Sequence, residues 1–133
     1  MAAANEPAGL IDTDILIDAA RGRREAVAFL DGQRASSRMQ ISIISAMELT
    51  AGSRDKVELA QVQEFLASVI VLPISEAISQ KALGLMENFF LSHGLLIPDA
   101  LIAATALEHA LDLYTKNTRH FQMIPGLGLS RPY

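Results

Sequence analysis

The chain has 133 residues and a formal net charge of −4, half of its residues are hydrophobic, and only 20% are charged. This length favours a single domain with a sizeable core, and the composition excludes a disordered protein. Because there is no cysteine, disulfides and thiolate metal sites are excluded too. The negative charge argues mildly against a dedicated nucleic-acid wrapper, but it allows an enzyme that binds nucleic acid locally.

Targeting signals are not evident in the sequence. No apolar run approaches the roughly 20 residues that are needed to cross a bilayer, and residues 1–8 lack the basic and apolar parts of a secretory signal. We therefore expect a cytoplasmic protein with no membrane association. It should consist of a short flexible tail at residues 1–8 and one domain over residues 9–133.

Strand-like and helix-like segments alternate along the chain. Short apolar or β-branched runs predict strands at residues 9–11, 39–44, 69–73 and 111–115. Amphipathic periodicity, with polar starts and glycine stops, predicts helices at residues 13–20, 25–34, 45–52, 55–68, 75–93 and 98–110. The segment from Pro125 is expected to be a loop or a weak edge strand.

This alternation implies parallel strands joined by right-handed crossovers. We predict an α/β fold, a three-layer α/β/α sandwich with a central parallel sheet. Ligands of such sheets bind beyond the carboxyl ends of the strands. Asp12 directly follows the first strand, Glu48 follows the second by one short turn, and Asn117 follows the strand at 111–115. Asp99 opens the apolar helix at 98–110, so all four residues are expected at one end of the sheet.

Three of these four residues are carboxylates beside apolar segments. Such carboxylates repel one another, and their burial is costly unless a cation lies between them. Oxygen ligands without cysteine or a paired histidine motif favour Mg²⁺ or Mn²⁺ over Zn²⁺. Asp12, Glu48 and Asp99 are therefore candidate metal ligands, and the chemistry expected of such a site is metal-assisted hydrolysis of a phosphate ester.

Each acid also has a purely structural explanation. Asp12 could be a helix N-cap, and Asp99 could favour the positive end of its helix. Ser45 and Glu48 have the spacing of a capping box. A non-catalytic α/β binding domain, in which the acids only cap helices, is therefore a second hypothesis.

A receiver-like domain that acts on small phosphates is a third hypothesis. Asp12 and Asp14 resemble its acid pair and Lys116 its lysine, but no central strand ends in an aspartate that could be phosphorylated. Asp14 either shapes the pocket or caps the helix, and Asp18 is expected to be a solvated surface residue. The role of His120 stays open.

Basic residues near these acids are each expected to be solvated surface charges, but together they could contact phosphates. They are Arg21, Arg23, Arg24, Arg34, Arg38, Lys116 and Arg119.

Four segments together resemble the PIN-domain ribonucleases of the VapC toxin type. They are residues 10–18, 43–52, 97–106 and 113–121, and their order and spacing span nearly the whole chain. The resemblance implies a divalent-metal-dependent endoribonuclease, the toxin of a toxin–antitoxin pair, that hydrolyses RNA phosphodiester bonds. It also implies a homodimer and a partner antitoxin whose tail blocks the active site.

The resemblance carries over to individual positions of this chain. Three residues match the core acids of the family: Asp12, Glu48 and Asp99. Asn117 stands where many PIN nucleases have a fourth acid, and it can orient a water molecule or a ligand without adding charge. Thr13 and Thr115 match polar positions that line the same pocket.

Overall fold

A computed structural model of the protein describes residues 9–36 and 39–133. The tail predicted at residues 1–8 and the side chain of Arg38 lie outside the described residues. In chain order the elements are β1 (Gly9–Ile11), α2 (Thr13–Ala20), α3 (Arg24–Ala35), β2 (Gln40–Ser42), α4 (Ile43–Ala51), α5 (Lys56–Ala67), β3 (Ile70–Leu72), α6 (Glu76–His93), α7 (Ile97–Glu108), β4 (Asp112–Tyr114), the 3₁₀ helix η1 (Thr118–His120) and β5 (Leu129–Ser130).

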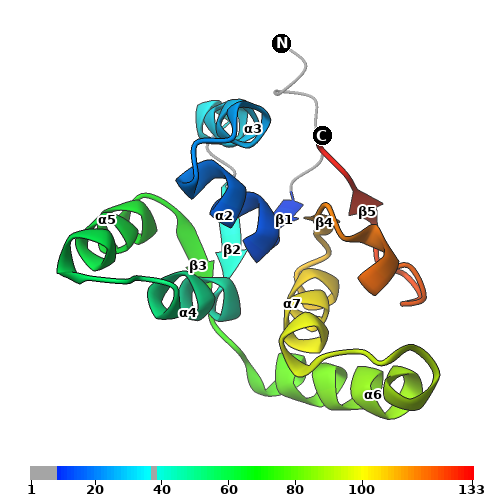
Figure 1. The fold of residues 1–133 in the computed structure, drawn as a ribbon. Coiled ribbons are helices and arrows are strands. Elements are labelled where there is room, and N and C mark those ends of the chain that lie inside the picture. The colour runs from blue at the N-terminus through cyan, green and yellow to red at the C-terminus, as the bar shows by residue number, and fades with distance from the viewer. Residues whose placement is uncertain (1–8, 37–38) are drawn as a thin grey trace.

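The strands form one parallel sheet with the order β3-β2-β1-β4-β5. The first strand lies in the middle, and the chain builds outward from it on one side and then on the other (Figure 1). This reversal creates a topological switch point beside β1, where ligands of open α/β sheets bind. The predicted α/β/α sandwich with a central parallel sheet is confirmed.

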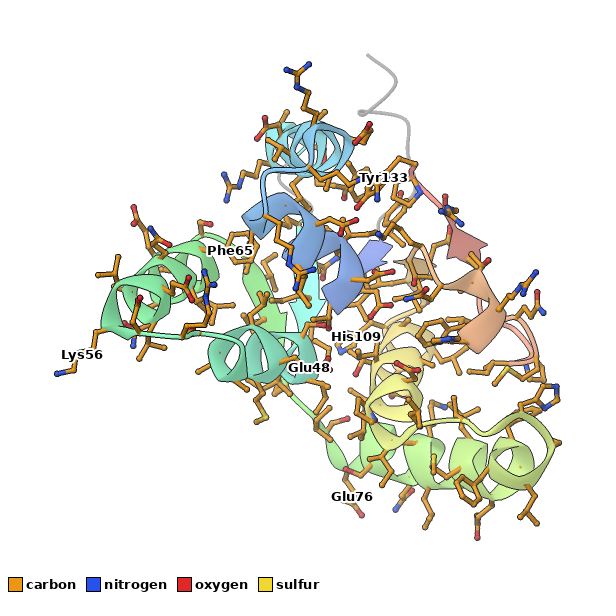
Figure 2. All side chains as sticks on the ribbon, in the orientation of Figure 1. Glu48, Lys56, Phe65, Glu76, His109 and Tyr133 are labelled. Carbon is orange, nitrogen blue, oxygen red and sulfur yellow. The ribbon has the colours of Figure 1, made fainter. Side chains whose placement is uncertain are left out.

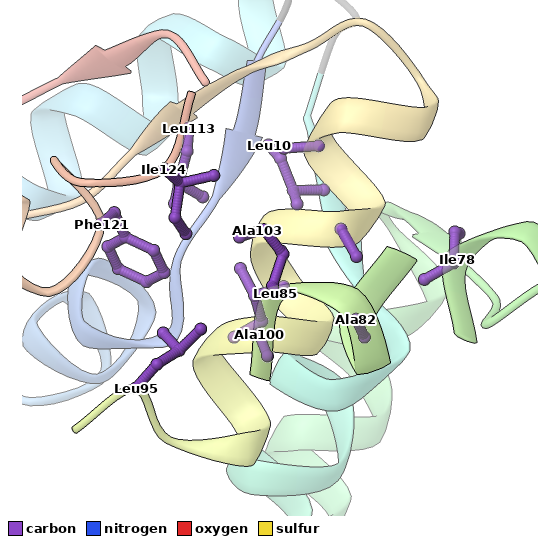
Figure 3. Close-up of a cluster of buried hydrophobic side chains, with 13 residues drawn as sticks. Leu10, Ile78, Ala82, Leu85, Leu95, Ala100, Ala103, Leu113, Phe121 and Ile124 are labelled. Carbon is purple, nitrogen blue, oxygen red and sulfur yellow. The ribbon is translucent and has the colours of Figure 1, made fainter. Parts of the chain in front are cut away.

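Two hydrophobic cores lie on opposite faces of the sheet because consecutive strand residues point to opposite sides. Leu10 and Leu113 pack against α6 and α7 in one core (Figure 3). Ile11 and Tyr114, the next residues along the same strands, pack into the second core with α2 to α5. Helix α7 is buried from Ile102 to Ala106, which agrees with its almost uniformly apolar sequence.

The boundary between β2 and α4 differs from the prediction. The strand ends at Ser42, and the hydroxyl of this residue caps the helix by accepting a hydrogen bond from the backbone N–H of Ile44 at 3.0 Å. The proposed capping box of Ser45 and Glu48 is therefore wrong, because Ser45 already lies inside the helix. The β-branched residues Ile43 and Ile44 resemble a continuing strand, but they pack as the first turn of α4 into the two cores.

Other helix ends follow the sequence closely. Asp55 caps α5 and Ser75 caps α6, each by accepting a backbone hydrogen bond three residues further on. Gly94 ends α6 in the left-handed conformation, with φ of 66°. The 3₁₀ turn η1 was not predicted. Among the described helices, none combines the length and the apolar character that a membrane span requires.

A glycine in β1 provides a test of this packing. A Cβ at Gly9 would overlap the ring of Tyr114, which is buried and contacts Phe29 edge to face. We expect Gly9→Ala to lower the free energy of unfolding by about 1–3 kcal/mol in urea denaturation. The matched control is Gly84→Ala in α6, where a Cβ meets nothing within 4 Å. It should raise stability by about 0.5–1 kcal/mol, and equal effects of the two changes would contradict this packing.

Candidate active site

Asp12 lies at the carboxyl end of β1 and joins two strands of the sheet. It is the N-cap of α2, where one carboxylate oxygen accepts a hydrogen bond from the backbone N–H of Thr13 at 2.8 Å. The other oxygen accepts from the hydroxyl of Thr115, just after β4, at 2.8 Å. Only 6% of Asp12 is exposed. The capping explanation is thus correct for this residue, but it accounts for only one of its two carboxylate oxygens.

Glu48 reaches the same region from α4 (Figure 2). Its Oε1 accepts a hydrogen bond at 2.8 Å from the hydroxyl of Thr13, which also lies 2.8 Å from the hydroxyl of Ser45. The expectation that Glu48 is buried is wrong, because this residue is exposed while Thr13 and Ser45 are buried. The hydroxyl of Thr13 therefore links an exposed carboxylate to the start of α2.

Asp99 lies in the first turn of α7 and is half-buried. His120 on η1 lies beside it, with Nδ1 3.6 Å from the Asp99 carboxylate. The structure therefore places His120, whose role the sequence left open, beside one of the three candidate acids. The first turn of α7 also brings Asp99 near the positive end of the helix, as expected from its position after Pro98.

Asn117 is connected to the site by a hydrogen bond to Asp14. The amide Nδ2 of Asn117 donates to Asp14 Oδ2 at 3.2 Å, and the backbone N–H of Lys116 donates to the same oxygen at 2.9 Å. The hydroxyl of Thr115 lies 3.4 Å from it. Sequence reasoning left Asp14 open between a cap and a pocket residue. In the structure it is the acceptor that holds the segment after β4 against α2.

The carboxylates influence one another strongly. Burial raises the pKa of Asp12 from 3.8 to about 7, and the negative charges of Asp14 and, more weakly, Asp99 add to this rise. The hydrogen bonds from Thr115 and Thr13 act in the opposite direction but do not offset it. Asp12 is therefore an acid whose ionisation is costly unless a positive charge comes close.

Asp99 responds in the same way. Burial raises the pKa of its carboxyl group, His120 opposes this rise, and the charges of Glu48 and Asp14 reinforce it. Asp99 thus lies within electrostatic reach of carboxylates on α2 and α4. The electrostatic contacts of Asp12, Glu48 and Asp99 therefore join acids from three separate parts of the chain, and their role as metal ligands stays a prediction.

Comparisons with known proteins agree with this geometry. Residues 9–127 match the PIN domain. The chain belongs to the PIN domain family. It is 38% identical over 119 residues to a protein of Mycobacterium tuberculosis named ribonuclease VapC10, and the match covers 89% of each chain. It is 37% identical over 124 residues to ribonuclease VapC19 of the same species, covering 89% of this chain and 95% of the relative.

Solved structures show the same fold. The chain resembles a protein in a toxin–antitoxin complex from Klebsiella pneumoniae with a TM-score of 0.77 and 35% sequence identity. That match covers 94% of this chain and 98% of the other. The PIN domain, and with it the resemblance stated from the sequence, is confirmed.

The side chains of this PIN domain fit a hard divalent cation in their chemistry. Nucleases of the VapC type generally depend on a divalent metal. The donors are carboxylate oxygens, and the pKa values of Asp12 and Asp99 are raised first by burial and then by neighbouring carboxylates, both of which a bound cation would offset. Among the described residues, however, no three acidic or histidine side chains are already gathered closely enough to hold an ion. The exposed Glu48 and the half-buried Asp99 would have to move toward Asp12 on binding.

A groove of about 700 Å³ leads away from Glu48 between α2, α3, α4 and α5. Its apolar lining includes Leu16, Leu30, Leu49, Val62 and Phe65. Arg34, one of the basic residues noted in the sequence, lies in the groove with its guanidinium 5.6 Å from the ring centre of Phe65. The groove therefore combines an apolar floor with charges of both signs, since Arg21, Arg34 and Arg54 line it together with Asp31, Glu48 and Glu58.

Asp18 is not the solvated surface residue that the sequence suggested. One of its oxygens lies 2.5 Å from the ammonium of Lys116 and accepts a hydrogen bond from the hydroxyl of Tyr133 at 2.8 Å. The guanidinium of Arg23 lies 3.4 Å from the same oxygen. The four-residue spacing of Asp14 and Asp18 puts both carboxylates on one face of α2, and the sequence did not reveal that this face meets the segment after β4.

The raised pKa of Asp12 predicts how the stability of the metal-free protein depends on pH. The folded protein binds more protons than the unfolded chain between pH 3.8 and about 7, so the free energy of unfolding should fall as pH rises through this window. In EDTA-treated protein we expect Asp12→Asn to weaken this fall by on the order of 1–3 kcal/mol. Urea denaturation at several pH values measures the effect.

The control for this experiment is Glu87→Gln, which changes an exposed acid on α6. It should retain the pH dependence of the original protein. An equal fall in stability with and without Asp12 would show that this carboxyl group does not carry the raised pKa.

Proposed function

We propose that this PIN-domain protein is the toxin of a VapBC-type toxin–antitoxin pair, and that it hydrolyses RNA phosphodiester bonds as a divalent-metal-dependent endoribonuclease. The observation that carries the proposal is that Asp12 lies at the switch point of a parallel sheet, where the charge of Asp99 acts on it and the charge of Glu48 acts on Asp99. Two relatives named ribonucleases, each at least 37% identical across 89% of the chain, support it.

Asp12, Glu48 and Asp99 would hold Mg²⁺ or Mn²⁺. When bound, such an ion lowers the pKa of a water molecule and neutralises negative charge on the phosphate. The buried Asp12 gives the site a fixed ligand, because hydrogen bonds hold both of its oxygens. Glu48 and Asp99 are more exposed, so they supply the ligands that adjust to the ion and the substrate.

The segment after β4 would orient the substrate. Asn117 carries no charge, and we assign it the orientation of a water molecule or of the scissile phosphate. Of the two cations beside it, Arg119 is exposed whereas the ammonium of Lys116 is paired with Asp18. Arg119 is therefore the better candidate for contact with the RNA backbone, since phosphate contacts need an available cation.

A binding domain whose acids only cap helices accounts for less of the structure. Asp12 is an N-cap, but Glu48 lies well inside α4, which is capped by Ser42. Asp99 does lie in the first turn of α7, where the positive helix end favours a carboxylate. Glu48 is thus the acid that lacks the structural role that this alternative requires.

Substitution of the candidate ligands tests the proposed activity. We expect Asp99→Asn and Glu48→Gln each to reduce RNA cleavage by roughly 100-fold or more, because each removes a charge that would hold the ion. Cleavage of a labelled RNA and calorimetric titration with Mn²⁺ measure the two effects. Glu87→Gln should cleave and bind as the original protein does, and circular dichroism confirms folding. Unchanged cleavage in both site variants would refute the assignment.

We also propose an antitoxin partner, as in the complex from Klebsiella pneumoniae, and activity in the cytoplasm. The groove beside Glu48 supports this proposal, because an apolar floor rimmed by charged residues suits the apolar face of an amphipathic segment. A segment lying there would reach the acidic site and block it.

Homodimer formation is a further part of the proposal. Large apolar side chains are exposed around the junction of α6 and α7, and Leu91 is 94% exposed. The group consists of Leu83, Phe90, Leu91, Leu96 and Ile97. Monomeric proteins rarely expose so many neighbouring apolar side chains, which marks this face as a contact surface for a second copy.

A pair of charges on this face should separate the dimer. We expect the double variant Leu83→Glu/Leu91→Glu to weaken association by at least about 10-fold in sedimentation experiments, since each change places a charge in an apolar interface. The control is Val57→Glu, which alters an exposed apolar residue on another helix, α5. Association that survives the double change would place the interface elsewhere.

A further inference from the structure

Lys116 contacts α2 through both its backbone and its side chain. Its backbone N–H donates to Asp14 at 2.9 Å, and its ammonium lies 2.5 Å from Asp18, one helical turn further along α2. Both side chains of the Lys116–Asp18 pair are largely shielded, with 20% and 16% exposed. A shielded ion pair loses less to solvent screening than an exposed one, so this contact restrains the segment after β4.

Tyr133, which follows β5, also contacts Asp18. Strand β5 runs beside β4, and the backbone N–H of Thr115 donates to the carbonyl of Ser130 at 3.0 Å. The chain beyond β5 then carries the ring of Tyr133 next to α2 and α3 (Figure 2). There the hydroxyl donates to Asp18 at 2.8 Å, and the ammonium of Lys116 lies 5.8 Å from the ring centre.

The protonation states of Asp18 and Tyr133 at neutral pH favour the hydrogen bond between them. Hydrogen bonds from Lys116 and Tyr133 lower the pKa of Asp18, so its carboxylate is ionised. Burial and the neighbouring carboxylate raise the pKa of Tyr133, so its hydroxyl keeps the proton that it donates. Arg23 adds a second cation at 3.4 Å from Asp18, with its guanidinium 4.8 Å from the ring centre of Tyr133.

We propose that Asp18 and Tyr133 are positioning residues for the active site. By fixing the ammonium of Lys116, they keep the backbone N–H of Lys116 and the amide of Asn117 on Asp14. The functional part of this inference rests on the proposed nuclease activity. The residues that match the PIN domain end at 127, so Tyr133 lies beyond the matched stretch. We call Asp18, Lys116 and Tyr133 the Asp18 anchor.

Hydrogen exchange tests the anchor without reference to activity. In Tyr133→Phe, which removes only the hydroxyl, the Lys116 amide should exchange about 5-fold faster, and in Asp18→Asn about 10-fold or more, because local opening becomes easier. NMR of the metal-free protein measures both rates. Glu25→Gln is the matched control, since it removes the exposed contact of Glu25 with Arg23 at 3.3 Å but leaves the anchor intact. Exchange at the rate of the original protein in both anchor variants would overturn the inference.

Cleavage kinetics then distinguish positioning from packing. We expect both anchor variants to lower kcat by about 10-fold with KM within 2-fold, because a misplaced active-site segment affects the reacting geometry. Faster exchange with unchanged kcat would overturn the positioning role. A raised KM with unchanged kcat would overturn it too, since Lys116 would then be binding RNA directly. If the original protein cleaves no RNA, the proposed function fails, and the exchange rates alone support or overturn the anchor.

Discussion

The cost of ionising buried, neighbouring carboxylates at one end of the sheet is the constraint on which the rest of the site depends. Asp12 is nearly inaccessible to solvent, yet the fold places it within reach of the charges of Asp14 and Asp99. Two hydrogen bonds to Asp12 lower the cost of its ionisation but leave its pKa near 7. A fold that concentrates negative charge in a buried place is less stable than it could be, and such strain is typical of a site built for a positively charged ligand.

The sheet creates this constraint through simple strand geometry. Alternate residues of β1 and β4 fill the two cores, so the polar residue that follows each strand comes out at the same edge. Asp12 follows β1, Thr115 follows β4, and a hydrogen bond joins them across the edge. Because the cores fix both strands, the position of Asp12 does not depend on a flexible loop. The same order of elements brings the first turns of α4 and α7 to this edge.

Most helices and strands were predictable from local sequence patterns, whereas side-chain contacts between distant segments were not. The helix caps at Asp55 and Ser75 and the stop at Gly94 were predictable, because each depends on neighbouring residues. The start of α4 was misplaced because Ile43 and Ile44 have strand-like side chains, and their helical state depends on packing from both faces of the sheet. The pairing of Asp18 with Lys116 and Tyr133 is a contact of the same long-range kind, since both partners come from the distant C-terminal part of the sequence.

Asn117 is explained by the same balance of charge. Its amide donates to Asp14, which an aspartate at this position could not do in its ionised form. An additional carboxylate there would face Asp14 across about 3 Å and would raise the cost of the whole cluster. In this chain Asp14 therefore supplies the negative charge on that side of the site, and position 117 supplies a neutral donor that satisfies it. The departure from the fourth acid of many PIN nucleases is thus compensated within the chain, with the acid on α2 and its hydrogen-bond donor after β4.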